Sequence, residues 1–198
     1  MKIGLFFGSF NPIHTGHLAI ANYMLENTEL EKIWFVVSPQ NPLKKKEDLF
    51  PNELRLKMVE DSIKSTSQFK ASDIEFKLPQ PSYTINTLKH LKEKFQNNTF
   101  SLIIGSDNLE IFHKWKNFEE ILTHYDIYIY PRSKPGRRKQ HVLQRRPPPH
   151  PRVKMTKAPV IEISSTEIRA AIKNKKDVRR FLPEAAWKYM EKMRFYVK

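Results

Sequence analysis

The sequence contains no cysteine, which excludes disulfide bonds, zinc–thiolate sites and catalysis by a thiol nucleophile. It also contains no run of about 18 apolar residues, the minimum for a helix that crosses a membrane. The N-terminus enters an apolar segment directly, without the charged leader and cleavage site of a secretory signal. We therefore expect a protein that has no membrane partner and is located in the cytoplasm.

Acidic residues are missing between Asp126 and Glu162, whereas ten Lys and Arg residues lie there. These ten account for most of the formal net charge of +14 and leave +4 for the rest of the chain. Seven of the 14 prolines fall in the same stretch. We interpret residues 132–158 as a basic, proline-rich loop with a short strand near Val153. The charge is local and the loop has no aromatic residue on which a base could stack, so we do not expect nucleic acid as a partner.

The remaining composition is that of an ordinary globular protein. With 198 residues, of which 39% are hydrophobic and 28% charged, the chain is too apolar to be disordered and long enough to bury its own core. We find no internal repeat. We therefore expect one domain over residues 1–198, which includes C-terminal helices over residues 165–198.

Short apolar runs alternate along the chain with segments of helical period. The runs, which we interpret as buried strands, cover residues 3–7, 33–37, 73–76, 100–104 and 126–130. The helical segments cover residues 52–63, 84–95, 166–172 and 184–193, and a further one follows Thr15. This alternation predicts an α/β fold: a doubly wound, mostly parallel sheet with right-handed crossovers and a small C-terminal helical extension. In such a sheet a ligand binds beyond the carboxyl ends of the strands.

The strongest chemical signal follows the first predicted strand, between Gly8 and His17. Gly8 permits a tight turn and a close approach of a ligand to the backbone. Gly16 leaves the start of the next helix without a side chain, so a phosphate can reach the N–H groups there. His14 and His17 stand three residues apart and can face one anion from the first helical turn. A single histidine near a helix start is more often a surface or capping residue, but two histidines that flank a glycine at a strand end favour a phosphate site.

The motif at residues 14–17, His-Thr-Gly-His, resembles the His-x-Gly-His signature of the nucleotidyltransferase superfamily. The longer string that begins at Gly8 resembles the nicotinate mononucleotide adenylyltransferases, with Asn11 where that family often has Asp. The resemblance implies a Rossmann-like nucleotidyltransferase fold and a role in NAD biosynthesis. It also implies that ATP and its phosphates are bound by Gly8, Ser9, Phe10 and Gly16.

A second motif, Ile-Ser-Ser-Thr-Glu-Ile-Arg at residues 163–169, stands at the start of a predicted helix and resembles the same family's C-terminal signature. Backbone N–H groups and hydroxyls at Ser165 and Thr166 can hold phosphate oxygens, with Arg169 one turn further along the helix. The alternative is a capping box between Ser164 and Glu167 that only starts the helix. Both can hold, because a capped helix start is also an anion site.

Two further stretches resemble the family's mononucleotide site. Residues 80–88 resemble its Ser-Tyr-Thr-x-Asp-Thr-Leu stretch, with Asn86 in place of Asp, and residues 104–107 resemble its Gly-x-Asp segment. The resemblance implies that Tyr83, Thr84 and Trp115 enclose the nicotinate ring, with the indole stacked on the pyridine. In the same way it implies that ATP contacts Gly105 and Asp107. Each aromatic residue alone would more often belong to the core, but the linked set favours the site.

Residues 38–44, which follow the second predicted strand, resemble the family's Pro-Pro-His-Lys loop. Leu43 occupies the position of the family histidine, so no imidazole acts there. Lys44 is retained, and we expect it to contact the triphosphate. Lys45 and Lys46 fit a solvated turn better.

The resemblance implies transfer of AMP from ATP to the 5′-phosphate of nicotinate mononucleotide, with release of pyrophosphate. That phosphate is already ionised near pH 7, since its second pKa is about 6, so no protein nucleophile is needed. Catalysis then consists of alignment and charge neutralisation, which we assign to His14, His17, Lys44 and Arg169. We expect Mg²⁺ with ATP, bound by phosphates and water, because the sequence offers no carboxylate cage.

Several alternatives stay open. The Tyr83-Thr84 and Trp115 elements argue against an adenylyltransferase for pantetheine phosphate. An enzyme for nicotinamide mononucleotide would differ only by a carboxylate-to-amide change in its substrate, which is a subtle pocket difference. An RNA-binding module built on the basic loop would bind with steep salt dependence and would survive loss of the two histidines. The sequence also leaves a homo-oligomer open.

Overall fold

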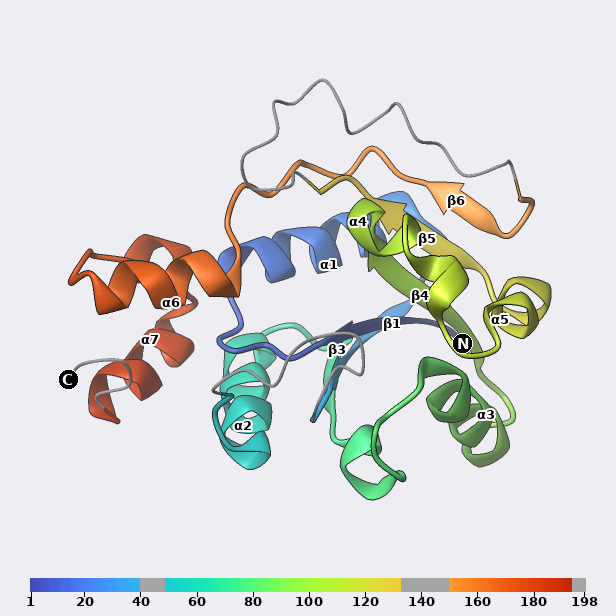
Figure 1. Ribbon diagram of the computed structural model, residues 1–198, viewed down its shortest axis with the longest axis horizontal. Coiled ribbons are helices and arrows are strands. Elements are labelled where there is room, and N and C mark those ends of the chain that lie inside the picture. The colour runs from blue at the N-terminus through green and yellow to red at the C-terminus, as the bar shows by residue number, and fades with distance from the viewer. Residues whose placement is uncertain (40–48, 133–149, 194–198) are drawn as a thin grey trace.

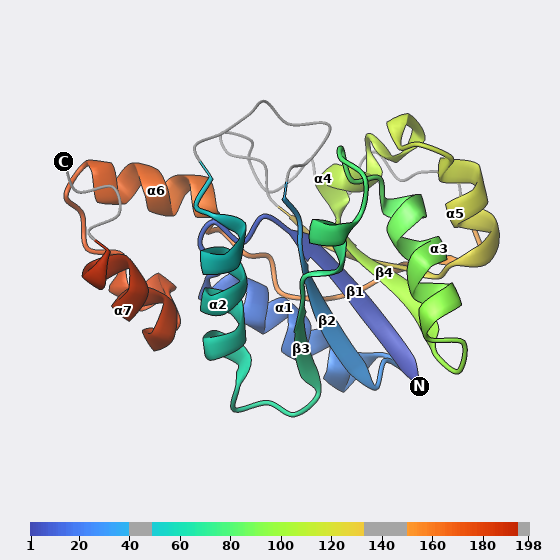
Figure 2. The same ribbon diagram turned by 90° about the horizontal axis from the view of Figure 1, so that it is seen from below.

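The computed structural model describes residues 1–39, 49–132 and 150–193, which contain one six-stranded sheet (Figure 1, Figure 2). The strands are β1 (Lys2–Gly8), β2 (Lys32–Val37), β3 (Phe69–Ser72), β4 (Thr99–Gly105), β5 (Ile127–Tyr130) and β6 (Val153–Met155). Their order is β3-β2-β1-β4-β5-β6, and every neighbouring pair is parallel. The predicted doubly wound, parallel α/β sheet is confirmed.

Both faces of the sheet are buried, and the strand side chains alternate between them. On β2, Phe35 belongs to one hydrophobic core, whereas Trp34 and Val36 belong to the other. A strand that is buried on both faces consists of a continuous apolar run rather than an alternating one. This is why the sequence signal for the central strands is strong.

Helices cover both faces. On the face with Phe35 lie α1 (Thr15–Asn27), α2 (Asn52–Ile63), α6 (Ser165–Lys173) and α7 (Glu184–Lys192). On the face with Trp34 lie α3 (Thr84–Lys94) and α5 (Phe118–His124), while α4 (Ser106–Leu109) is a short helix directly after β4. The helices predicted at residues 52–63, 84–95, 166–172 and 184–193 agree with these bounds to within one residue. In the part of the chain that the structure describes, no helix is long and apolar enough to span a membrane.

The strand order reverses between β1 and β4. From β1 the chain proceeds outward through β2 and β3 on one side, and from β4 it proceeds outward through β5 and β6 on the other. Connections that leave two adjacent strands in opposite directions open a crevice beyond the carboxyl ends of those strands. Since β1 ends at Gly8 and β4 ends at Gly105, the crevice lies at two of the predicted ATP-binding glycines.

The strand predicted at residues 73–76 is wrong. β3 covers Phe69–Ser72, and Ile74–Lys77 form a 3₁₀ helix. β3 is an edge strand that is only partly buried, so its residues carry little apolar pattern. Ile74 and Phe76 suggested a strand because they alternate with polar residues, but Ile74 packs in the Trp34 core and Phe76 against the Phe35 core.

The structure also corrects the C-terminal end of the loop predicted at residues 132–158. The short strand near Val153 is confirmed as β6, but β6 extends the sheet beyond β5, and Ala158 is buried in the Phe35 core. The charges here are paired rather than only solvated: Lys154 Nζ lies 2.8 Å from Glu29 Oε1 and 2.9 Å from Asp126 Oδ2. Six of the ten basic residues fall within residues 133–149, which lie outside the described residues.

Candidate active site

Residues 9–14 connect β1 to α1 along the carboxyl edge of the sheet. Ser38, which follows β2, donates its N–H to the Gly8 carbonyl at 2.9 Å and so fixes the end of β1. Gly8 has no room for a side chain, because a Cβ there would lie 2.9 Å from the ring of Phe10. Phe10 has a φ of 44°, and the whole residue is 1% exposed within the core. The predicted contact of Phe10 with ATP stays a prediction.

His14 and His17 stack against each other at the start of α1. Their ring centroids are 3.6 Å apart with an interplanar angle of 28°, and the His14 N–H donates to His17 Nδ1 at 3.2 Å. The His17 ring also packs edge-on against Phe6 and Phe10, with centroid distances of 5.8 and 5.0 Å. The two imidazoles therefore stand together where the sequence predicted, and their catalytic role stays a prediction.

His14 is only 4% exposed, and its Nδ1 has no hydrogen-bond partner among the described residues. Burial, with a smaller contribution from the charge of Arg132, lowers the pKa of His14 from 6.5 to about 3. The imidazole is therefore neutral at pH 7 in the unliganded protein. Without a ligand His14 therefore offers an N–H donor rather than a charge, and an anion bound beside it would raise its pKa again. The predicted role of His14 at the phosphates stays a prediction.

Gly16 is buried between the histidines and the segment that follows β6. A Cβ at this position would lie 2.3 Å from Ile161 Cγ2 and 3.0 Å from His14 Nδ1. Sequence analysis explained Gly16 by access of a phosphate to the helix start. The structure adds a packing reason, since any side chain here would push Ile161 away from α1.

The C-terminal motif docks on the loop between β1 and α1 (Figure 1). Ser165 Oγ donates to the Pro12 carbonyl at 2.9 Å, and Arg169 Nη1 donates to the Asn11 carbonyl at 2.9 Å. These contacts join residues that are 153 and 158 positions apart in the sequence. The structure thus brings both predicted phosphate motifs to one place.

The start of α6 is capped as the alternative interpretation of this motif predicted. Ser164 Oγ accepts a hydrogen bond from the Glu167 N–H at 3.2 Å and donates to the Glu167 carboxylate at 2.7 Å. Thr166 is exposed, and its hydroxyl accepts a hydrogen bond from Arg169 Nη2 at 3.4 Å. The Ser164 cap is confirmed, but the Glu167 carboxylate binds the Ser164 hydroxyl rather than the backbone N–H of a full capping box. Phosphate binding by Ser165 and Thr166 stays a prediction.

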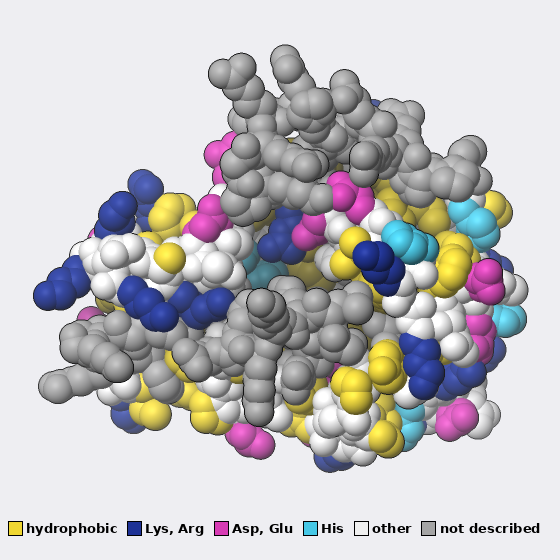
Figure 3. Space-filling model, in the orientation of Figure 1, with side chains coloured by type: hydrophobic (Ala, Val, Ile, Leu, Met, Phe, Trp, Pro, Cys, Tyr) yellow, Lys and Arg dark blue, Asp and Glu magenta, His cyan; other side chains and the backbone are white. Residues whose placement is uncertain are grey.

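Beyond β4, Gly105 leaves space that Asp107 occupies. A Cβ at Gly105 would lie 2.4 Å from Asp107 Oδ1, an oxygen that is buried without a hydrogen-bond partner among the described residues. Asp107 Oδ2 lies 3.4 Å from Arg132 Nη1, and Ser106 Oγ accepts from the Arg132 N–H at 3.0 Å. In Figure 3 a hollow near the centre of the visible face contains acidic, basic and histidine side chains. Arg132 is thus a site residue that sequence analysis counted only as part of the basic loop.

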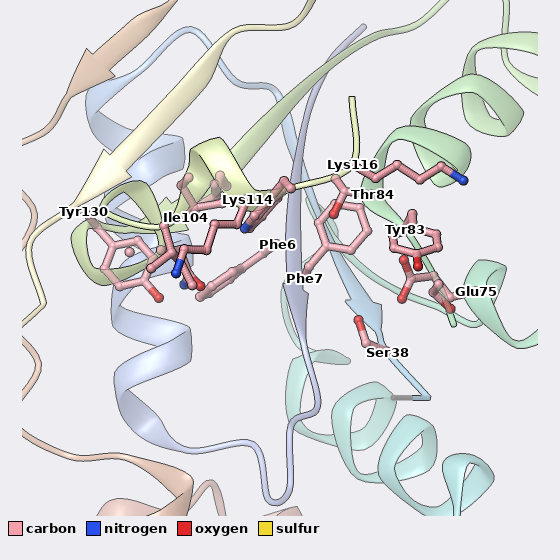
Figure 4. Close-up of a pocket in the computed structure, with 16 residues that line it drawn as sticks. Phe6, Phe7, Ser38, Glu75, Tyr83, Thr84, Ile104, Lys114, Lys116 and Tyr130 are labelled. Atoms are coloured by element: carbon pink, nitrogen blue, oxygen red, sulfur yellow. The ribbon is translucent and has the colours of Figure 1, made fainter. Parts of the chain in front are cut away.

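A pocket lies beside the ends of β1 and β4 (Figure 4). It is lined by Tyr83, Thr84 and Trp115, the three residues predicted to bind the mononucleotide, and by Gly105. Phe6 lines the same pocket, and its ring contacts the His17 ring with the centroids 5.8 Å apart. The predicted mononucleotide residues are therefore gathered in one pocket, and this pocket adjoins the two histidines.

Two lysines adjacent to Trp115 in the sequence also line this pocket. Lys116 Nζ lies 4.6 Å from the centroid of the Tyr83 ring, while Lys114 extends toward Ile104 and Phe6 (Figure 4). Trp115 packs on Phe112 with their ring centroids 5.0 Å apart, and its Nε1 is buried without a hydrogen-bond partner among the described residues. The lining of the pocket thus includes aromatic rings and two cationic side chains.

Glu75 brings a buried carboxyl group to the wall of the pocket near Tyr83 (Figure 4). It is 2% exposed and accepts a hydrogen bond from Thr87 Oγ1 at 2.8 Å. Burial raises the pKa of Glu75, although hydrogen bonds from Ser38 and Thr87 oppose this shift. Sequence analysis missed this residue because it placed residues 73–76 in a strand.

Comparison with known proteins shows the family to which the chain belongs. The family model described as cytidylyltransferase-like matches residues 5–171. A protein from Flavobacterium psychrophilum, named "Probable nicotinate-nucleotide adenylyltransferase", is 51% identical over 198 residues and is covered completely, as is this chain. The chain belongs to the nicotinate-nucleotide adenylyltransferase family. A member of the same name from Bacteroides fragilis is 48% identical over 187 residues, which are 94% of this chain and 90% of that protein.

A solved structure of a related adenylyltransferase shares the fold. The nicotinic acid mononucleotide adenylyltransferase of Plasmodium falciparum, complexed with NaAD, has a TM-score of 0.76 at 21% identity. The alignment covers 98% of this chain and 97% of the other. The doubly wound α/β sheet of this chain is therefore a nucleotidyltransferase-like fold.

Two departures from the adenylyltransferase pattern can be placed in the structure. Asn11 is buried, and its Oδ1 accepts a hydrogen bond from the Phe50 N–H at 3.1 Å, a contact that an aspartate oxygen could also make. Asn86 is exposed on α3. Leu43 and Lys44 lie outside the described residues, so contact of Lys44 with the triphosphate stays a prediction.

Metal ligands do not cluster in the described part of this adenylyltransferase. Within residues 1–39, 49–132 and 150–193, no group of three or more His, Asp or Glu residues is arranged to hold a metal ion. Asp107, whose Oδ1 is buried, is already paired with Arg132.

Proposed function

We propose that the chain transfers AMP from ATP to nicotinate mononucleotide, forming deamido-NAD and pyrophosphate. The observation that carries this proposal is the junction of the two predicted sites, since Phe6 lines the Tyr83–Trp115 pocket and also contacts His17. A mononucleotide whose pyridine ring lies in the pocket can therefore place its 5′-phosphate near the start of α1. Full-length relatives that carry the name of this activity support the same assignment.

The reaction requires no covalent intermediate with the protein. An oxygen of the mononucleotide phosphate forms a bond to the α-phosphorus of ATP. The bond from that phosphorus to the oxygen bridging to the β-phosphorus breaks, and its electron pair leaves with pyrophosphate. Since the attacking phosphate is ionised at neutral pH, the protein has only to align the reactants and stabilise charge on the phosphoryl oxygens.

His14 contributes an N–H donor from a site that excludes water. A bound polyphosphate opposes the effect of burial on the His14 pKa, so ATP binding and proton uptake at His14 are coupled. Arg132 and Arg169 supply positive charges from the segment after β5 and from α6. We assign phosphate contacts to Ser165 and Thr166 through their backbone N–H groups, because the Ser165 hydroxyl already donates to Pro12.

We propose that ATP enters as its magnesium complex. Mg²⁺ keeps several waters and is commonly held by one or two carboxylates together with substrate phosphates. The described residues contain no three-residue cluster for a metal, which fits an ion that arrives with the nucleotide. Mg²⁺ is then part of the substrate.

We infer that the pocket favours the acid form of the mononucleotide over the amide, because Lys114 and Lys116 bring positive charge to a lining whose acceptor groups include Glu75 and Asn108. A carboxylate only accepts hydrogen bonds, whereas the amide of nicotinamide would bring an NH₂ group against donors. Nicotinamide mononucleotide remains the second candidate because the difference is confined to one group.

Pyrophosphate release with Mg²⁺ and ATP tests the assignment. We expect turnover with nicotinate mononucleotide, at a kcat/KM about tenfold or more above that with nicotinamide mononucleotide. Phosphopantetheine serves as the control acceptor, and we expect no turnover with it. Turnover with phosphopantetheine, or with neither mononucleotide, would contradict the proposal.

A further inference from the structure

Arg55 on α2 is buried completely, with an exposure of 0%. Its guanidinium donates hydrogen bonds to five oxygen atoms. The acceptors are the carbonyls of Ser9 (2.5 Å), Ser38 (2.9 Å), Phe50 (3.0 Å) and Pro39 (3.5 Å), and Asn52 Oδ1 (2.5 Å). None of these acceptors is a carboxylate. Sequence analysis gave Arg55 no role, because one arginine in an amphipathic helix carries no such signal.

Arg55 satisfies buried carbonyls, but a buried cation that has only neutral acceptors also carries a desolvation cost. Burial lowers the pKa of Arg55 to about 10, so the side chain stays charged at pH 7. An apolar side chain of similar volume often stabilises a core better than a buried charge does. The positions of the acceptors therefore indicate the role of Arg55. Three of them belong to the segments that follow β1 and β2 at the carboxyl edge of the sheet.

A phosphate site built from backbone must direct N–H groups toward the anion and carbonyl oxygens away from it. Donors from other segments hold one carbonyl at the end of β1 and three carbonyls of the loop between β1 and α1. The bonds run from Ser38 N–H to Gly8, from Arg55 to Ser9, from Arg169 to Asn11 and from Ser165 to Pro12. Arg55 also binds the Ser38 carbonyl, so one guanidinium joins the loop after β1 to the segment after β2.

We propose that Arg55 is a positioning residue for adenylyl transfer, which turns the Ser9 and Ser38 carbonyls away from the triphosphate and holds these two segments at a fixed separation. This inference rests on the proposed function, because it takes residues 9–14 as the phosphate-binding loop. Of the five hydrogen-bond partners of Arg55 described above, four lie outside the residues that line the mononucleotide pocket, and the fifth is Ser38. Loss of Arg55 therefore weakens ATP binding and turnover much more than it raises the KM for nicotinate mononucleotide.

Two substitutions and one matched control test this role. Arg55→Lys keeps a cation but not the planar fork, and Arg55→Gln removes the charge. The control is Met58→Ala, since Met58 lies on the same helix, is also 0% exposed and packs only in the core. Affinity for Mg²⁺-ATP is measured by titration calorimetry, and kcat and both KM values by pyrophosphate release. All are measured at a temperature where circular dichroism shows each variant folded.

We expect both Arg55 variants to lose about tenfold or more in ATP affinity and in kcat, with the mononucleotide KM within about threefold of wild type. Met58→Ala loses thermal stability but keeps ATP affinity and kcat. Unchanged ATP affinity in the Arg55 variants, or an equal loss in Met58→Ala, overturns the inference.

If neither Arg55 variant folds, Asn52→Ala replaces them. It keeps the cation and removes the bond from Nη2 to Asn52 Oδ1 at 2.5 Å, so the guanidinium loses one constraint. We expect a smaller loss of ATP affinity, about threefold, again without a change in the mononucleotide KM. Wild-type ATP affinity in Asn52→Ala then overturns the inference. A failure of the proposed function is distinct, since it would appear as wild-type protein that binds ATP but does not turn over nicotinate mononucleotide.

Discussion

Replacement of Trp115 by alanine tests the pocket most directly. The indole lines the pocket, packs on Phe112 on one side and leaves Nε1 without a hydrogen-bond partner among the described residues. If its face stacks on the pyridine, removal of the ring affects the mononucleotide and not ATP. We therefore expect the KM for nicotinate mononucleotide to rise while the KM for ATP stays within about twofold.

The magnitude follows from two contacts. Stacking of a base on an aromatic side chain contributes about 1–3 kcal/mol by alanine substitution. Since about 1.4 kcal/mol corresponds to a factor of ten, the expected rise in KM is about 5- to 150-fold. Trp115→Phe separates the second contact, because it keeps an aromatic face and removes the N–H donor. If the ligand's carboxylate accepts from Nε1, the phenylalanine variant also raises KM, by about tenfold for one hydrogen bond to a charged group.

Initial-rate measurements of pyrophosphate release, with each substrate varied in turn, give both KM values. Circular dichroism and a thermal melt check that each variant is folded, because Trp115 also packs on Phe112. Equal increases in both KM values, or a folded alanine variant with wild-type KM for the mononucleotide, would refute the stacking argument and return Trp115 to the core.

Three further predictions concern other groups of the site. We expect His14→Ala to lower kcat by about 100-fold with a native circular dichroism spectrum, as for loss of one transition-state contact; unchanged turnover would remove His14 from the phosphate site. Gly16→Ala will lower kcat, because its Cβ would lie 2.3 Å from Ile161 Cγ2, and adding Ile161→Ala will restore part of it if packing is the cause. Burial raises the pKa of Glu75 above its value in the unfolded chain, so folding favours the neutral acid and stability is lost as pH rises through the folded-state pKa. In urea unfolding the wild type will therefore lose stability relative to Glu75→Gln as the pH is raised from about 4 to 8, and a pH-independent difference would contradict this.

The central sheet could be predicted because its strands are buried on both faces. The apolar runs that correspond to β1, β2, β4 and β5 supply residues to both hydrophobic cores, and a run that is apolar at every position predicts such a buried strand. The position of the edge strand β3 was predicted wrongly. Its residues, Phe69–Ser72, are only partly buried, and the more apolar Ile74 and Phe76 follow immediately. An edge strand has less apolar pattern, so local sequence does not fix where it starts.

The candidate site was predictable where residues occur in one short motif, as for His14, Gly16 and His17. It was not predictable where distant segments create the environment of a side chain. The low pKa of His14 depends on burial and on Arg132, and the role inferred for Arg55 depends on carbonyls from three separate segments. Periodicity and motif spacing report neighbours along the chain and contain no information about such contacts.

The docking of α6 on the loop between β1 and α1 has a consequence for biosynthesis. Ser165 and Arg169 bind carbonyls that lie 153 and 158 residues earlier in the chain. At about 5–20 residues per second, a ribosome needs on the order of 8 to 30 seconds to synthesise the part between them. During that interval the nascent chain exposes its histidine motif without the partner that holds the loop carbonyls. We therefore expect an incomplete chain to hold ATP less tightly at this site than protein whose synthesis has passed α6.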